Sequence, residues 1–146
     1  MMVADIAVVA ITHAIQQAVA PVFLLAGVGA ILNVLANRLS RIVDRSRALH
    51  GRLEAASDER RQGIDRELAV LVRRGRVVHW AIAFATTSAL LVCLVIATLF
   101  VSAVAEWNSG LMVVALFVLA MLFLISALIG FLREIQLATR VILNGP

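Results

Sequence analysis

The sequence contains no lysine, so all 13 of its basic residues are arginine, and charged residues of both signs make up only 15% of its 146 positions. Hydrophobic residues make up 62%, and the mean hydropathy is +1.01. A soluble core of this size cannot bury that much apolar surface, because small domains leave much of their surface exposed. The shortage of charge therefore excludes an ordinary soluble domain and predicts a protein whose solvent is lipid.

Residues that carry catalysis or bind metals are also scarce. Cys93 is the single cysteine, which excludes a disulfide within the chain and a cysteine-based metal site. His13, His50 and His79 are predicted at three different depths relative to the membrane and cannot converge within one chain. The sequence also has no glycine-rich phosphate loop. We therefore expect no catalytic residue, no metal site, no cofactor and no enzymatic activity.

Three apolar stretches are long enough to cross a bilayer as helices, each holding about 20 apolar residues. They cover residues 20–37, 80–105 and 111–132. The second and third are joined by residues 106–110, which are too few for anything but a tight turn, so these two spans should be neighbours. The sequence thus predicts an all-α membrane protein with three transmembrane helices.

The arginines predict how these spans are oriented. Eleven of the 13 lie between Arg38 and Arg76, and the other two, Arg133 and Arg140, follow the last span. Because cytoplasmic flanks of membrane helices are enriched in basic residues, the segment 38–79 and the tail 133–146 should be cytoplasmic. The N-terminus and the 106–110 turn should then face the outside.

The N-terminal residues 1–19 form a weaker apolar stretch with a partly polar face. A single helix from here to residue 36 would be longer than the membrane is thick, and Pro21 suits the first turn of a new helix. We therefore expect a separate interfacial helix over residues 1–19, lying on the outer face, with a break near Ala20 and Pro21.

The cytoplasmic segment 38–79 has the period of two packed helices. In each half, one face is marked by residues at alternating steps of three and four. The first seam consists of Leu39, Ile42, Ser46, Leu49 and Leu53, and the second of Ile64, Leu68, Leu71, Gly75 and Val78. Two such seams joined by a short polar loop predict a long antiparallel helical hairpin between the first and second spans.

Three segments resemble a known family. They are NRLSRIVDRSR at 37–47, RRGRVVHWAI at 73–82 and FLREIQLATR at 131–140, and the pattern NRxxRxxDR that begins at Asn37 is the most specific part. Together they are similar to a bacterial three-span membrane-protein family known as domain of unknown function 2721. The resemblance covers nearly the whole chain and implies a multi-pass protein of the bacterial inner membrane. It implies no activity.

The first long helix carries one small and polar face that continues from the membrane into the cytoplasm. We assign to this face, and to the arginine beside its cytoplasmic end, a role in lining a pore or an interface between subunits: Ala30, Asn33, Asn37, Ser40, Arg41 and Asp44. Small residues let helices approach closely, and an intramembrane asparagine bonds a neighbouring helix. The same face could instead line an aqueous path along the axis of a homo-oligomer. Both alternatives stay open.

The arginines have two expected roles. Arg38, Arg41 and Arg133 flank spans and should contact lipid headgroups. Farther into the hairpin we expect ion pairs, with a plain solvated face as the alternative, among Arg45, Arg52, Glu54, Asp65 and Glu67. The hydroxyl residues of the second span can return hydrogen bonds to their own helix: Thr86, Thr87, Ser88, Thr98 and Ser102. Nucleic acid is not an expected partner, because six acids interrupt the arginines and aromatic residues are missing from the hairpin.

Two classes of function follow. The first is a non-enzymatic homo-oligomer that conducts ions through a pore lined by the first span. The second is a structural or accessory membrane module whose hairpin binds a protein partner or anionic lipid. In both, membrane lipid is the immediate surrounding of the chain.

Overall fold

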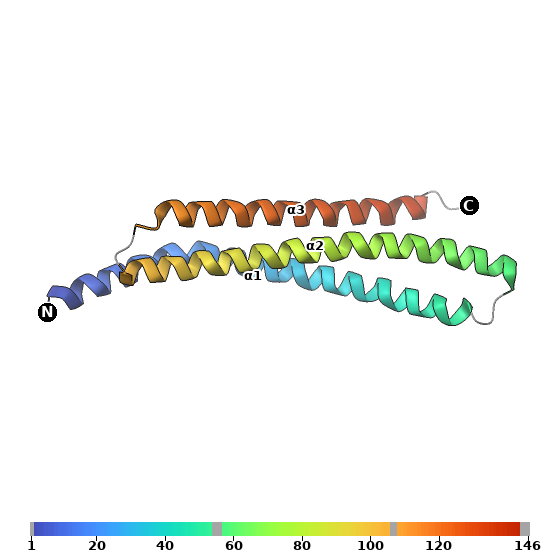
Figure 1. Cartoon of the computed structure of the whole chain (residues 1–146), viewed down its shortest axis with the longest axis horizontal. Helices are drawn as coiled ribbons and strands as arrows, with labels where there is room; N and C mark the ends of the chain where they lie inside the picture. Colours follow the sequence, from blue (N-terminus) through green and yellow to red (C-terminus); the bar gives the residue numbers. More distant parts are fainter. Residues whose placement is uncertain (1, 54–56, 106–107, 144–146) are drawn as a thin grey trace. The chain divides into compact units, whose positions relative to one another are not determined.

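The computed structural model consists of three long α-helices, labelled in Figure 1. They are α1 (Met2–Leu53), α2 (Asp58–Ala105) and α3 (Gly110–Leu143). The structure describes residues 2–53, 57–105 and 108–143, and the side chains of 8–53, 57–105 and 108–136. The prediction of an all-α protein with three long apolar helices is confirmed.

Each of the three helices is long and apolar enough to cross a membrane. The most apolar stretches of α1, α2 and α3 have mean hydropathies of 2.3, 2.6 and 3.0. Large apolar side chains remain exposed on all three helices, among them Phe23 (75%), Val104 (75%) and Leu111 (86%). Such surfaces are stable in lipid and unfavourable in water. The chain is therefore a multi-pass membrane protein.

The predicted break between an interfacial helix and the first span is not found. Helix α1 runs without interruption from Met2 to Leu53, with Pro21 inside it. Proline has no N–H, so the carbonyl of Gln17 loses its usual helical donor, but the bonds on either side hold the helix together. Helices in membranes tolerate such a proline better than soluble ones. The prediction of a separate interfacial helix over residues 1–19 is therefore wrong, because Pro21 does not end the helix.

The chain forms two compact units, each built from parts of all three helices. The first unit consists of Met1–Ile31 and Phe84–Ile125. Within it, Ser88 Oγ donates a hydrogen bond of 2.8 Å to the Ala120 carbonyl, which joins α2 to α3. The rings of Phe84 and Phe123 lie 5.9 Å apart between centroids. The second and third helices are neighbours here, as their short connection predicts.

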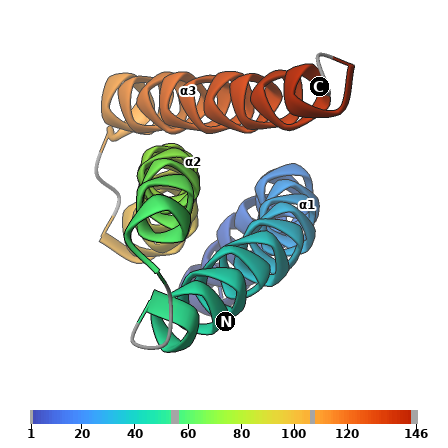
Figure 2. The same ribbon diagram turned by 90° about the vertical axis from the view of Figure 1, so that its right-hand side faces the viewer.

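The second unit consists of Leu32–Ala83 and Ser126–Pro146. Figure 2 shows the three helices from the end at which α1 and α2 are connected. The two predicted seams meet in this unit, where α1 and α2 run antiparallel. All ten seam residues are buried or half-buried. The part of α3 from Ser126 onward belongs to the same unit. The antiparallel parts of α1 and α2 are therefore not a separate two-helix hairpin. Residues 133–143 continue α3 as helix beyond the predicted end of the span.

Helix α3 approaches α2 closely in the second unit because small residues face each other. A Cβ atom built on Gly130 would lie 3.3 Å from the Cβ of Ala81, which is tighter than most such contacts. Ala127, one turn earlier on α3, is fully buried. Small residues at helix interfaces allow backbones in membranes to approach in this way. The contact brings the next turn of α3 against the basic part of α2.

Candidate functional site

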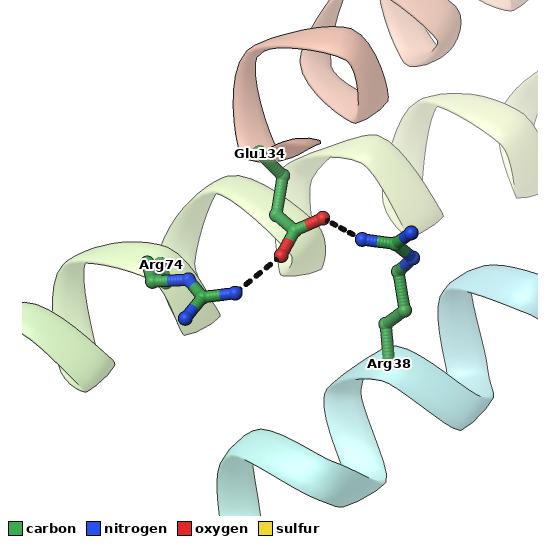
Figure 3. A network of polar contacts seen from close by, with 3 residues as sticks. All are labelled: Arg38, Arg74 and Glu134. Atoms are coloured by element: carbon green, nitrogen blue, oxygen red, sulfur yellow. Dashed lines mark hydrogen bonds and ion pairs between the residues drawn. The ribbon is translucent and has the colours of Figure 1, made fainter. Parts of the chain in front are cut away.

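A buried carboxylate joins all three helices of the second unit (Figure 3). Glu134 of α3 accepts a hydrogen bond of 2.5 Å from Arg38 Nη1 of α1 through Oε2. Its other oxygen, Oε1, accepts one of 2.8 Å from Arg74 Nη2 of α2. The Glu134 side chain is only 2% exposed, whereas those of Arg38 and Arg74 are 36% and 24% exposed. One acid thus lies between two arginines that come from different helices.

The positions of these side chains follow from the packing of α3. Glu134 lies one turn after Gly130, whose contact with Ala81 holds α3 close to α2. Phe131, three residues before Glu134, has the Arg38 guanidinium 5.1 Å above its ring. A guanidinium at this distance is attracted to the ring face. Arg38 is therefore fixed twice by α3, once by charge and once by the ring.

The electrostatics of the cluster are unbalanced. A buried carboxylate requires cationic or hydrogen-bonding partners, and Glu134 has two. Two arginines and one glutamate leave an excess of one positive charge. In addition, Arg74 Nε is buried and has no hydrogen-bond partner among the described residues. An unsatisfied buried donor costs about 1 to 3 kcal/mol. The cluster thus has one positive charge that is not neutralised and one N–H donor, that of Arg74 Nε, that has no acceptor among the described residues.

A cavity of about 540 Å³ opens beside this cluster. Three aliphatic residues and six polar or charged ones line it: Val34, Ile42, Leu71, Asn37, Arg38, Arg41, Arg45, Arg74 and Glu134. Four guanidinium groups and one carboxylate give the lining a formal charge of +3. All nine residues belong to the second unit. The cavity is therefore a concentrated positive site with a few aliphatic side chains.

The four arginines differ in how they are engaged. Arg45 donates to Glu67 Oε1 through Nε at 3.0 Å and through Nη2 at 2.7 Å. Both side chains of that pair are about half exposed, at 52% and 44%. Arg38 and Arg74 hold Glu134. Arg41 is exposed, and no hydrogen bond or ion pair joins it to another described residue. Its guanidinium is the cation of the lining that remains open to a ligand.

The residues predicted to line a pore or interface lie on an exposed face. Asn33, Asn37, Ser40 and Asp44 of the second unit are all exposed, and Ala30 is exposed in the first unit. Asn37, like Arg41, also lines the cavity.

Some of the residues predicted to bind headgroups or to form hairpin ion pairs have partners in the structure, and others are exposed without a described partner. Arg38 contacts Glu134 and Phe131, whereas Arg133 is exposed with no described partner. Of the residues expected in hairpin ion pairs, Arg45 and Glu67 are joined to each other. Arg52 and Asp65 are exposed and form no ion pair with a described residue, and Glu54 lies outside the described residues.

Sequence reasoning missed Glu134 and Arg74. One signal was present, because Glu134 is the only acidic residue after position 106 and directly follows an apolar span. An acidic residue next to a membrane span is costly without a cationic partner. In a chain with eleven arginines between Arg38 and Arg76, it is expected to pair with an arginine. Which arginine it contacts depends on which turns of α2 and α3 pack against each other. The sequence pattern does not specify that register.

A second cavity and a search for metal ligands provide no stronger candidate site among the described residues. A cavity of about 630 Å³ lies in the first unit beside Pro21, and no charged side chain lines it. Among the described residues, no group of three His, Cys, Asp or Glu side chains could hold a metal ion. The arginine-lined cavity is therefore the candidate site.

Comparison with known proteins agrees with the motifs that surround this cavity. No curated protein and no solved structure shows a significant similarity to the chain. One family profile matches residues 18–143, a range that includes both arginines of the cluster and Glu134. The chain therefore belongs to the family described as "Protein of unknown function (DUF2721)", as its motifs indicate.

Proposed function

We propose that this protein is a non-enzymatic module of the bacterial inner membrane whose second unit binds the headgroups of anionic lipids at the cytoplasmic surface. One observation carries the proposal, namely the cavity lined by four arginines and one carboxylate. Its formal charge of +3 attracts anions, and Arg41 has no described partner that would neutralise it.

The location of the arginines supports this assignment. Eleven of them lie between Arg38 and Arg76, directly after the apolar part of α1 and directly before that of α2. Arginines at such flanks face the cytoplasm and gain about 1 kcal/mol each from an anionic membrane surface. Guanidinium groups also match the geometry of phosphate oxygens, since they donate two parallel hydrogen bonds. Lipid headgroups are the anions available at this depth.

The test is the lipid dependence of stability. The purified full chain is transferred into mixed micelles that contain either phosphatidylglycerol, which is anionic, or phosphatidylcholine, which is zwitterionic. Preferential binding to the folded state raises the Tm, so the Tm should rise with phosphatidylglycerol and the rise should shrink at high salt. Equal Tm values in the two lipids would contradict the proposal.

A second candidate function rests on the exposed polar face of α1. Asn33, Asn37, Ser40 and Asp44 follow one another at helical spacing and are all exposed. Asparagine in contact with lipid tails is costly, so this face is expected to meet a second copy of the chain or water. We propose a homo-oligomer in which this face, extended by Ala30 and bordered by Arg41, forms the interface or lines an ion-conducting pore.

The oligomer is tested before the pore. Chemical cross-linking in native membranes should give discrete multimers, and Asn33→Leu should change their yield. If multimers form, ion currents across liposomes that contain the wild-type protein and the Asn33→Leu variant distinguish a pore from a packed interface. A chain that stays monomeric in native membranes would exclude both.

A further inference from the structure

We propose that the arginine-lined cavity is a binding site for one phosphate group, held by Arg41 together with donors of Arg38 and Arg74, and that Glu134 limits its affinity by occupying part of the same guanidinium groups. The inference rests on the proposed function and deepens it, because it names the chemical group, the residues that bind it and the residue that competes with it.

The cluster has hydrogen-bond donors to spare. A guanidinium carries five N–H donors in a planar fork, and it is always charged in proteins. Glu134 accepts from one nitrogen of Arg38, Nη1, and from one of Arg74, Nη2. The other nitrogens of both groups have no hydrogen-bond partner among the described residues, and one of them, Arg74 Nε, is buried. A ligand oxygen that reached this donor would satisfy it.

Arg41 adds a cation that the described chain leaves unused. It lines the cavity, and it lies three residues after Arg38 and four after Asn37 on the same side of α1. Arg45 has its Nε and Nη2 engaged with Glu67, so it contributes less. The arginines that carry the unused donors therefore come from α1 and α2 and line the same cavity.

Phosphate fits this arrangement better than smaller or flatter anions. A phosphate dianion neutralises more of the formal charge of +3 in the lining than a monovalent anion does. A phosphate group carries up to two negative charges and has at least two free oxygens that accept from several guanidiniums at once. The volume of about 540 Å³ has room for a phosphate together with a substituent. The shared chemistry is that of a phosphate ester headgroup or of free phosphate.

Glu134 is expected to weaken binding. Its carboxylate is part of the cavity wall and is only 2% exposed, so its negative charge repels an incoming phosphate with less screening by water than a surface charge would have. Glu134→Gln removes the charge and keeps the size of the side chain. The variant should be less stable than the wild type without ligand, since two arginines lose their counter-charge, and it should bind phosphate more tightly.

The experiment uses the purified full chain in an uncharged maltoside detergent, with inorganic phosphate titrated at constant ionic strength and the Tm followed. Three variants are compared: Arg41→Gln, Arg47→Gln and Glu134→Gln. Arg47 is an exposed arginine of α1 outside the cavity, so its substitution is the matched control for charge. Loss of one charge-assisted pair of hydrogen bonds should weaken phosphate binding about tenfold in Arg41→Gln and leave Arg47→Gln near wild type. Glu134→Gln should bind about tenfold more tightly.

A second arm identifies the source of the phosphate. The same variants are placed in nanodiscs of phosphatidylcholine with or without phosphatidic acid, whose headgroup is a phosphate monoester. Stabilisation by phosphatidic acid alone assigns the site to a lipid headgroup, and stabilisation by inorganic phosphate alone assigns it to a soluble ligand. An absence of response in both arms overturns the inference, as does an equal loss in Arg41→Gln and Arg47→Gln or weaker binding by Glu134→Gln.

Failure of this inference can be told apart from failure of the proposed function. If phosphatidylglycerol raises the Tm but Arg41→Gln behaves like Arg47→Gln, the chain binds anionic lipid without a specific phosphate site. If inorganic phosphate binds through Arg41 but no anionic lipid has an effect, the site exists and the proposed lipid function is wrong.

Discussion

Glu134 and Arg38 are 96 residues apart in the sequence, and a hydrogen bond of 2.5 Å joins them. The bond connects the last part of α3 to α1 within the second unit, and Arg74 extends the connection to α2. Because the carboxylate is almost fully buried, its two ion pairs are screened less by water and salt than pairs on the surface. This single side chain thus joins three helices at the candidate site.

Truncation of Glu134 tests that role in stability. Glu134→Ala removes the carboxylate and leaves Arg38 and Arg74 facing each other, which should lower the free energy of unfolding by about 2 to 4 kcal/mol. The matched control is Glu67→Ala, which breaks the half-exposed pair with Arg45 and should cost less than about 1 kcal/mol. Unfolding in mixed micelles measures both. Equal losses in the two variants would show that burial of Glu134 adds nothing.

The close contact of α2 and α3 makes a second prediction. A Cβ at Gly130 would already lie 3.3 Å from the Ala81 Cβ, so the larger side chain of Gly130→Leu must push the helices apart. We expect a loss of about 1 to 3 kcal/mol in the free energy of unfolding, as for other overpacked cores. Gly29→Leu is the control, because no atom lies within 4 Å of a Cβ at Gly29. A Gly130→Leu variant as stable as Gly29→Leu would contradict the packing described.

The parts of the fold that depend on local periodicity could be predicted from the sequence. The seam of α1 and α2 follows from residues spaced three and four apart, and Ile42, Leu49, Ile64 and Leu71 are buried as that spacing requires. Helices long enough to span the membrane follow from hydropathy alone.

The parts that depend on contacts between distant segments could not be predicted. Whether Pro21 ends a helix depends on what surrounds its missing N–H, and here the helix continues. Ser88 was expected to bond its own helix, as Thr98 does to the Leu94 carbonyl, but Ser88 bonds to α3. The same limit applies to Glu134, whose partners come from two other helices.

The hydrogen bond of Ser88 gives a third prediction. Ser88→Ala leaves the Ala120 carbonyl without this donor and should lower the free energy of unfolding by about 0.5 to 1.5 kcal/mol, the usual range between membrane helices. Thr98→Ala removes a hydroxyl that bonds within α2, so it should have a smaller effect. Thermal unfolding of both variants is the measurement, and a larger loss in Thr98→Ala would refute the assignment.

The proposed orientation makes a fourth prediction, tested by cysteine labelling in a Cys93→Ser background. Asp44 and Asn108 are both exposed, and one apolar stretch of α2 separates them along the chain. The excess of arginine between residues 38 and 76 predicts that Asp44 lies on the cytoplasmic side and Asn108 on the outside. A membrane-impermeant thiol reagent should therefore label Asn108→Cys in intact cells and Asp44→Cys only in inverted membrane vesicles.

The control for this labelling is a buried position near Asp44. Leu49 is 2% exposed in the seam of α1 and α2, so Leu49→Cys should react from neither side while the protein is folded. Labelling of Asp44→Cys in intact cells, together with protection of Asn108→Cys, would invert the orientation. The arginine-lined cavity would then face the outside, and anionic headgroups of the cytoplasmic leaflet could not be its ligand, because the cavity residues share the second unit with Asp44.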